Sequence, residues 1–476
     1  MSFGGPSQPQ QPSPYTPPPA PQPSPAAQPA PPQYAPAAPP QPPAYAPATP
    51  PQPPAPQQQA PTPQQPPAPQ FSQQQYAQSA YTPRQFSQQP VYASALAQPT
   101  PYTPPAPAAP SPAEGLPALP VPTRKGRSVS IWLFGFLGLL LLALIGYFVV
   151  ALGPSASVIG LVLALIPLAI VFLGVRLIDR WEPEPKSLVI FAIAWGAIAA
   201  VGLTLLVDLA LTLAFGFRSE EIAAVVQAPI VEEFWKGFGV FLIFLVARRA
   251  FDGPIDGVVY GALVGAGFAF TENIQYFAIS LIEGGGEQLS VTFVVRALLS
   301  PFAHAMFTSL TGLAIGLAAR RHSSAWAAFG AGLLGLLGAI LLHALWNGSA
   351  TYADFFLLYF TLQVPLFAGF IIGIVALRRE EARLTKARLG DYAAAGWFTP
   401  EEVTMLATPA GRKVGMAWAA RLRGDRRPLM REFIKDATTL ASVRQRAITG
   451  RDPLASEDER ALLIRTRATR AALLAY

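Results

Sequence analysis

The sequence predicts an all-α, polytopic membrane protein: a bundle of about eight transmembrane helices between a disordered, proline-rich N-terminal tail and a small helical C-terminal region. Hydrophobic residues make up 51% of the 476 residues and charged residues only 13%, whereas about a quarter of an average soluble domain is charged. Prolines crowd the N-terminal end, and long apolar runs separated by short polar joints fill the middle. This pattern excludes a single soluble enzyme. The absence of cysteine excludes disulfides and thiolate chemistry.

The N-terminal segment, residues 1–122, holds 41 of the 53 prolines but only two charged side chains, Arg84 and Glu114. Proline removes backbone donors and blocks helices, and there is little apolar surface to bury, so we expect an extended, disordered cytoplasmic tail. Its Tyr-x-Pro and Pro-x-x-Pro spacings could bind an aromatic groove of a cytoplasmic partner. A solvated spacer is the simpler interpretation.

The central segment, residues 131–377, is predicted to be the transmembrane domain. A helix needs about 20 apolar residues to cross the hydrocarbon core, and eight runs meet this requirement. They are Ile131–Leu152, Ser157–Leu177, Ser187–Ala214, Ala223–Val246, Gly257–Ile282, Val291–Ala318, Ala325–Trp346 and Phe355–Leu377.

Charge asymmetry predicts the orientation of these spans. Basic clusters precede the first span and follow the second, fourth, sixth and eighth, so an even count of eight places all of them on one side. Because basic loops stay in the cytoplasm, both termini are predicted to be cytoplasmic, in a multi-pass protein of the cell membrane.

The C-terminal segment, residues 378–476, carries 20 Lys and Arg against 12 Asp and Glu. Thr399 to Glu402 and Ser456 to Glu459 both fit a helix capping box, and Leu429, Phe433, Ala437 and Leu440 recur at helical spacing. We therefore expect a basic helical cytoplasmic domain that lies against the anionic headgroups of the bilayer. No nucleic-acid-binding motif accompanies the charge.

Ionisable side chains inside the apolar runs are the candidate functional residues, because charge in the hydrocarbon core is costly. Lys236 can pair with either Glu232 or Glu233 on one helix face, and His343 shares a face with Asn347, as His304 does with Thr308. One polar cavity in the outer half of the membrane would satisfy all of these groups. The candidate catalytic residues are Glu232, Glu233, Lys236, Glu272, Asn273, His304, His343 and Asn347.

Two chemistries suit this set of side chains. Adjacent carboxylates in a low dielectric can divide the roles of acid and base for hydrolysis, while a histidine or an asparagine stabilises the oxyanion. Alternatively, Glu233, Glu272, His304 and His343 could ligate a divalent metal such as zinc that activates water. No His-Glu-x-x-His motif is present, which weakens the zinc interpretation without removing it.

Structural interpretations of the same residues remain open. The glutamates with Lys236 could be a neutralised structural cluster, and Glu272, His304 and His343 could each be a packing or capping residue. Asp208 and Arg296 are interpreted as structural or interfacial, with a pair between them conceivable. The glycine runs near Gly261 and Gly312 are interpreted as helix-packing surfaces.

Several segments resemble motifs of the PrsW family of intramembrane proteases. These are Ala228–Lys236 (APIVEEFWK), Phe268–Asn273 (FAFTEN), Pro301–Gly312 (PFAHAMFTSLTG), His343–Asn347 (HALWN) and the loop Asp179–Pro185 (DRWEPEP), with Asp252 and Asp256-Gly257 fitting the approach to the second. The resemblance covers about residues 160–380 and neither tail.

The resemblance implies a membrane-embedded endopeptidase that cuts single-pass membrane proteins at the extracytoplasmic side, notably anti-sigma factors in stress signalling. Members are often called metalloproteases. The family is similar to the type II CAAX prenyl proteases, and this implies Glu232 or Glu233 as the base and His343 with Asn347 as the oxyanion site. Glu272 stands where those proteases usually have a second histidine.

Two other functions compete with the protease. A proton-coupled transporter also uses buried Glu and His residues, but it predicts an inverted repeat, and the carboxylate pair occurs only once in this sequence. A non-catalytic membrane scaffold predicts that deletion of residues 1–122 abolishes function and that Glu233→Gln does not. The protease predicts the reverse.

Overall fold

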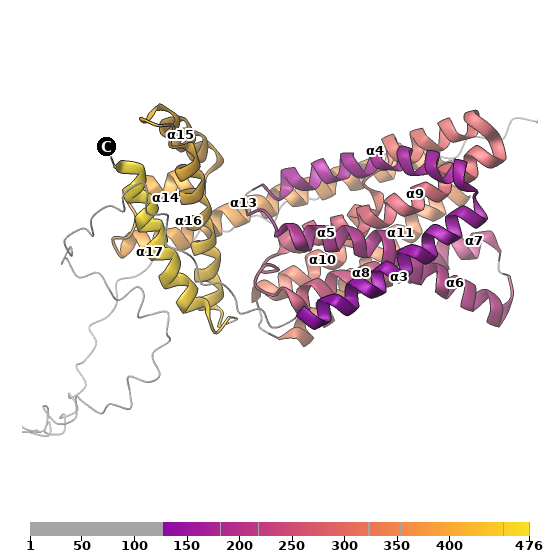
Figure 1. Cartoon of the computed structure of the whole chain (residues 1–476), viewed down its shortest axis with the longest axis horizontal. Coiled ribbons are helices and arrows are strands. Elements are labelled where there is room, and N and C mark those ends of the chain that lie inside the picture. Colours follow the sequence, from indigo (N-terminus) through magenta and orange to yellow (C-terminus); the bar gives the residue numbers. More distant parts are fainter. Residues whose placement is uncertain are drawn as a thin grey trace, which may run out of the picture. The chain divides into compact units, whose positions relative to one another are not determined.

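The computed structural model describes residues 127–475, except Trp181, Arg218, His322, Ser323, Ala353 and Arg451. Every regular element in this part of the chain is helical (Figure 1). The prediction of an all-α polytopic membrane protein is therefore confirmed. The predicted disordered tail, residues 1–122, lies outside the described residues.

The chain enters the bundle through two apolar helices, α3 (Arg127–Ala151) and α4 (Pro154–Ile178). The next span combines α5 (Lys186–Ala194), the π-helical segment η2 (Trp195–Ala200) and α6 (Val201–Phe215). A short helix, α7 (Glu220–Ile222), and the π-helical segment η3 (Ala223–Gln227) lead into α8 (Ala228–Val246).

The second half of the bundle begins with α9 (Pro254–Phe293), followed by the π-helical segment η4 (Val294–Leu299) and α10 (Ala303–Arg321). After α11 (Ala325–Tyr352), the short α12 (Phe355–Leu358) and the π-helical segment η5 (Tyr359–Gln363) lead into α13 (Val364–Ala394).

Six helical segments of the described chain are long and apolar enough to cross a membrane, whereas the sequence predicted eight spans. Two differences account for the count. The predicted fourth span is α8, whose 19 residues include Glu232, Glu233 and Lys236 and are therefore too charged for a purely apolar criterion. The predicted fifth and sixth spans lie together in the single segment Pro254–Arg321, which is 68 residues long.

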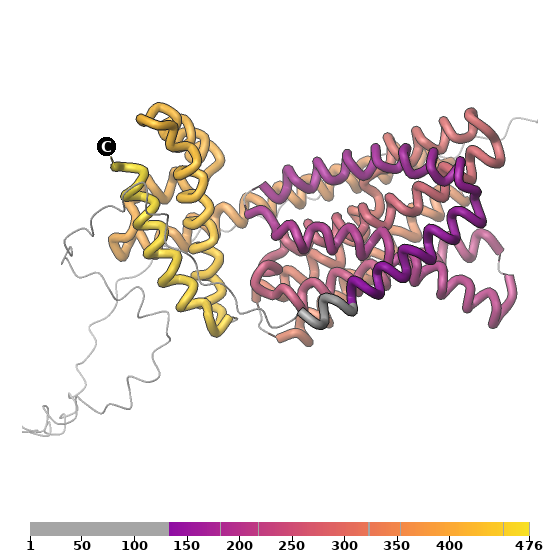
Figure 2. The backbone as a smooth tube through the Cα atoms, in the orientation of Figure 1, coloured from indigo at the N-terminus to yellow at the C-terminus, as the bar shows by residue number. Residues whose placement is uncertain are grey.

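The chain reverses within that long segment at Gly285, whose φ of 64° lies in the left-handed region that only glycine adopts at low cost. Contacts across the turn show the reversal. The Phe277 and Phe293 rings lie 5.7 Å apart, and the Ser280 and Thr292 hydroxyls lie 2.8 Å apart. The tube in Figure 2 turns back at this place. Two antiparallel crossings thus meet at a turn of a few residues around Gly285.

Glycines bring α10 directly against the first half of α9. A Cβ atom on Gly257 would lie 2.0 Å from the Gly312 carbonyl oxygen, and one on Gly265 would lie 2.3 Å from the His304 carbonyl oxygen. No side chain fits in that space, so the two backbones are in contact. The interpretation of these glycines as packing surfaces is confirmed, and the contact fixes the position of His304 relative to α9.

The C-terminal helices are α14 (Pro400–Ala407), α15 (Pro409–Arg421), α16 (Arg427–Ile448) and α17 (Ala455–Leu474). With the end of α13 they enclose a separate apolar core that includes Phe433 and Leu440. The capping box of Thr399 and Glu402 forms as predicted. The second predicted box is wrong: α17 begins at Ala455, and Glu459 is buried, where it accepts a hydrogen bond from Tyr392.

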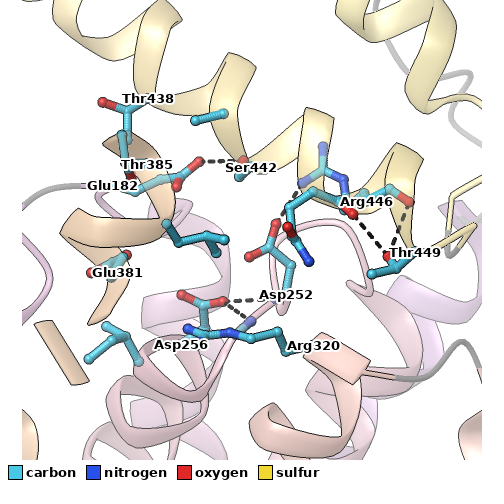
Figure 3. A pocket seen from close by; sticks show the side chains of 15 residues that line it. Glu182, Asp252, Asp256, Arg320, Glu381, Thr385, Thr438, Ser442, Arg446 and Thr449 are labelled. Atoms are coloured by element: carbon cyan, nitrogen blue, oxygen red, sulfur yellow. Dashed lines mark hydrogen bonds and ion pairs between the residues drawn. The ribbon is translucent and has the colours of Figure 1, made fainter. Parts of the chain in front are cut away.

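Helix α16 contacts the loops that join the membrane helices (Figure 3). The Arg446 guanidinium donates to Asp252 at 2.7 Å and to the Arg249 carbonyl at 3.2 Å, and Ser442 donates to Glu182 at 3.3 Å. Asp252 lies between α8 and α9. The C-terminal helices therefore hold the connection between the two helices that carry Glu232, Glu233 and Glu272.

Candidate active site

The centre of the site is one face of α8, where two adjacent carboxylates meet a lysine. Glu232 is 7% exposed, and Glu233 and Lys236 are fully buried. The Lys236 Nζ lies 3.2 Å from Glu232 Oε2 and 2.7 Å from Glu233 Oε1. Both pairings predicted from the three- and four-residue spacing are formed. A buried cluster of charges is costly unless each charge is paired, so further partners must come from other helices.

Helix α10 supplies two of those partners. His304 Nδ1 lies 3.1 Å from Lys236 Nζ, and the Thr308 hydroxyl donates to Glu233 Oε2 at 2.9 Å. His304 and Thr308 are four residues apart, so both side chains lie on the face of α10 that contacts the cluster on α8. The sequence places Thr308 on the His304 face but not among the candidate catalytic residues.

Helix α11 supplies His343, which is buried at 2% exposure. Its Nδ1 lies 3.0 Å from Glu233 Oε1, and its Nε2 lies 3.9 Å from Glu232 Oε2. The ring stacks on Phe307 at a centroid distance of 5.0 Å, and His304 lies at the same distance. The two imidazoles and the two carboxylates thus form one contiguous cluster across three helices.

Helix α9 adds Glu272 at the edge of this cluster. His304 Nε2 lies 2.9 Å from Glu272 Oε2, so His304 bridges Glu272 and Lys236. Glu272 also accepts a hydrogen bond from Arg296, whose Nε donates to Asn273 Oδ1 at 2.6 Å. Arg296 therefore holds both Glu272 and the next residue in the chain, Asn273.

Arg296 is the residue that the sequence interpretation missed. The sequence predicts a structural or interfacial role for it, with a conceivable pair to Asp208, and that pair is not formed. Asp208 accepts instead from the Gln227 side chain at 2.7 Å. The reversal at Gly285 carries Arg296 back beside Glu272, 24 residues earlier in the chain. A basic residue within an apolar run was the signal available in the sequence.

Asn347 lies apart from the carboxylates. Its Nδ2 donates at 2.8 Å to the carbonyl of Ala224 in η3. This bond ties the end of α11 to the π-helical turn that precedes α8, so it braces the helix that carries Glu232 and Glu233. His343 and Asn347 share a face as predicted, but the structure brings only His343 to the cluster.

Aromatic rings close the cluster from the sides. Lys236 Nζ lies 3.9 Å from the centroid of the Phe268 ring, a distance at which a cation is attracted to the face of the ring. Trp195 Nε1 donates to the Trp235 carbonyl at 3.0 Å and fixes α8 against η2. These rings lower the local dielectric and strengthen each charge interaction inside.

Three of the side chains are placed to share one metal ion. Glu232, His304 and His343 each offer a ligand atom, and these atoms lie within 4.8 Å of one another. This His₂Glu donor set fits a catalytic zinc site with an open position. It differs from the predicted set, because Glu232 joins the two histidines, whereas Glu233 is bonded to Lys236, Thr308 and His343.

Comparison with known proteins identifies relatives of the membrane region. Residues 184–370 match the family model described as "PrsW family intramembrane metalloprotease". The chain is similar to Protease PrsW of Geobacillus kaustophilus, with 32% identity over 155 residues, covering 32% of this chain and 64% of the relative. It is also similar to Protease PrsW of Clostridioides difficile, with 32% identity over 152 residues, covering 32% and 62%.

A further relative is Protease PrsW of Bacillus subtilis, with 38% identity over 92 residues, covering 19% of this chain and 38% of the relative. The chain thus spans about three-fifths of the length of the first two relatives. No solved structure matches. The resemblance to the PrsW family is confirmed over residues 184–370, the stretch that includes every candidate site residue.

Proposed function

We propose that this chain, whose residues 184–370 match the PrsW family, is an intramembrane endopeptidase that hydrolyses a peptide bond of a membrane-protein substrate. The observation that carries the proposal is the buried cluster of Glu232, Glu233, Lys236, His304 and His343. Such a cluster is costly to bury, and neither a scaffold nor simple helix packing requires adjacent buried carboxylates.

The two glutamates take different roles in this proposal. Glu233 is fully buried, and both of its oxygens are occupied by Lys236, His343 and Thr308, so it is a positioning residue. Glu232 is the less buried of the two and lines a cavity. We therefore assign Glu232 as the general base that takes a proton from water.

In the reaction, the water oxygen bonds to the scissile carbonyl carbon while its proton passes to Glu232. The C–N bond then breaks, and the proton returns to the leaving amine. His343, with Nε2 3.9 Å from Glu232, lies where an imidazole can stabilise the oxyanion. A zinc ion held by Glu232, His304 and His343 would instead supply the polarisation of water and carbonyl itself, and Glu232 and His343 would then be ligands in place of the roles given above.

The substrate and the orientation belong to the proposal as well. We propose that the scissile bond lies in a single-pass protein, such as an anti-sigma factor, near the extracytoplasmic face. Both termini of the protease are then cytoplasmic, which the basic clusters between the spans support. A bond within an intact transmembrane helix is shielded and hydrogen-bonded, so the substrate must present a partly unwound segment.

The test uses the full-length protein reconstituted in lipid vesicles. Substrates are supplied as solubilised membrane proteins from cells that carry the Glu232→Gln variant, in which uncut substrates accumulate. New N-termini are identified by mass spectrometry. We expect them with wild type and with Asp208→Asn, whose carboxylate lies outside the cluster. We expect none with Glu232→Gln. Equal numbers of new N-termini with all three proteins would refute the protease assignment.

A further inference from the structure

A cavity of about 330 Å³ lies beside the cluster, between α6 and the middle of α9. Glu232 and Glu272 line it together with Phe268, Gln275 and Tyr276. The side of the cavity formed by α6 is lined by Val201, Thr204 and Leu205. Its volume falls within the range of ligand pockets, which run from about 300 to 1,000 Å³.

Helix α6 is packed against the bundle only at its beginning. Val201 is 3% exposed, whereas Leu206, Leu209 and Leu213 are 53%, 55% and 79% exposed. The preceding turn is tightly held, since a Cβ on Gly196 would lie 2.0 Å from the Val264 carbonyl oxygen. Figure 1 shows α6 at the edge of the bundle, beside α7. The cavity is thus bordered by a helix that is fixed at one end and faces lipid along the rest.

One polar group in the cavity has no partner among the described residues. The Thr204 hydroxyl oxygen is buried and makes no hydrogen bond, although a threonine in a helix commonly bonds to the preceding turn. A buried unsatisfied hydroxyl costs about 1 to 3 kcal/mol. The rest of the α6 side is apolar. Thr204 lines the cavity, and a rotation about its χ1 would turn this unpaired hydroxyl toward a ligand next to the apolar surface, at the edge of the carboxylate cluster.

We infer that this cavity binds an extended segment of the substrate, which enters from the lipid past α6. An apolar substrate side chain packs between Leu205 and Phe268, and Thr204 bonds to the substrate backbone. An extended segment has free backbone groups for Thr204, which an intact helix lacks. A lipid acyl chain, which has no hydrogen-bonding group, would leave the Thr204 hydroxyl without a partner. The inference rests on the proposed function and names the substrate conformation that the same site selects.

The first test measures cleavage in the reconstituted system. Thr204→Trp fills the cavity and should lower cleavage at least 100-fold, whereas Thr204→Val keeps the shape without the hydroxyl and should lower it about tenfold, equivalent to about 1.4 kcal/mol. Leu213→Trp adds the same bulk on the exposed part of α6 and should leave cleavage unchanged. Equal thermal unfolding midpoints establish that the variants fold. Wild-type cleavage with an unaffected Thr204→Trp would overturn the inference and leave the protease assignment standing.

The second test needs no catalysis. Benzoylphenylalanine replaces Leu205, or Leu213 as the control, in the Glu232→Gln protein in lipid vesicles. The probes are two biotinylated dodecapeptides of leucine, valine and serine, one unmodified and one forced into a helix by α-aminoisobutyrate. We expect photocrosslinking of the unmodified peptide from position 205 only. Crosslinks to lipid alone, or equal crosslinks from both positions, would overturn the inference even if the wild type cleaves other proteins.

Discussion

Lys236 is the residue on which the electrostatics of the cluster depend. Its ammonium lies 3.2 Å from Glu232 Oε2 and 3.1 Å from His304 Nδ1, two of the three side chains that could ligate a metal. A protonated lysine in this position balances the carboxylates. It also repels any second cation, because like charges a few Å apart in a low dielectric interact strongly.

This repulsion gives a prediction about metal binding. Lys236→Met should raise the affinity for zinc at least tenfold, since about 1.4 kcal/mol of relieved repulsion suffices. His343→Ala should lower the affinity, because it removes a ligand. Zinc bound per protein is measured by mass spectrometry at a series of buffered zinc concentrations. Weaker binding to Lys236→Met than to wild type would show that the lysine supports a metal site instead of competing with it.

At this scale the sequence predicted the local pairs but not the distant ones. The pairing of Lys236 with Glu232 and Glu233 follows from helical spacing, which one segment determines by itself. The bond from Thr308 to Glu233 and the bond from Arg296 to Glu272 depend on how helices pack. Asn347 shares the His343 face but bonds to the Ala224 carbonyl, a partner that spacing could not indicate.

Helices α9 and α10 hold the cluster together through direct backbone contact. The glycines on α9 allow α10 to approach so closely that a Cβ atom on Gly265 would lie only 2.3 Å from the His304 carbonyl oxygen. Because His304 on α10 bridges Lys236 on α8 and Glu272 on α9, a small shift of α10 would disturb its hydrogen bond with Lys236 and its contact with Glu272 at once. The geometry of the site therefore depends on residues that carry no chemistry.

A single methyl group tests this dependence. Gly265→Ala should destabilise the protein by about 1 to 3 kcal/mol, the usual cost of overpacking, and should lower cleavage as His304 moves. Gly330→Ala on α11 is the matched control, since no atom lies within 4 Å of a Cβ there. Unfolding in denaturant and the cleavage rate are measured for both. Equal stability and equal cleavage rates for the two variants would show that the contact between α9 and α10 does not determine the position of His304.

The elements themselves were largely predictable, because each apolar run is long enough to identify a helix. The separation of the fifth and sixth spans was predictable as well, because the charged, glycine-rich stretch from Glu283 to Gln288 marks their boundary. The chain reverses within this stretch, at Gly285. The π-helical turns beside α6, α8 and α10 leave no mark in an apolar sequence, because they differ from α-helix only in hydrogen-bond spacing.

At the scale of the whole molecule, the C-terminal helices contact the loops between the membrane helices through partly buried acidic groups. Burial, with the nearby carboxylates of Asp252 and Glu381, raises the pKa of Glu182 to about 8, and burial raises the pKa of Asp179 in the same loop to about 6. In the unfolded chain Glu182 loses its proton near its ordinary pKa of 4.5. Between that pH and about 8, the folded protein therefore holds a proton that the unfolded chain has released. Stability must then fall as the pH rises from about 4.5 to about 8.

This linkage predicts a pH-dependent attachment of α16. Amide hydrogen exchange in Arg427–Ile448, corrected for the intrinsic rate, should increase as the pH rises through this range. Glu182→Gln should reduce the slope, because an amide does not titrate. Asp425→Asn, which changes an exposed carboxylate beside Arg427, should leave the slope unchanged. A flat profile in the wild type, or an identical slope in Glu182→Gln, would contradict the role of Glu182.

The central claim is that Glu232 serves the hydrolysis of a membrane-protein substrate. The most direct measurement compares the membrane proteomes of cells that carry wild type, Glu232→Gln or Glu233→Gln, with and without envelope stress. We predict that an intact single-pass protein accumulates in both variants and that its extracytoplasmic fragment is present only with wild type. Identical proteomes in all three strains under both conditions would contradict the protease assignment and favour a transporter or a scaffold.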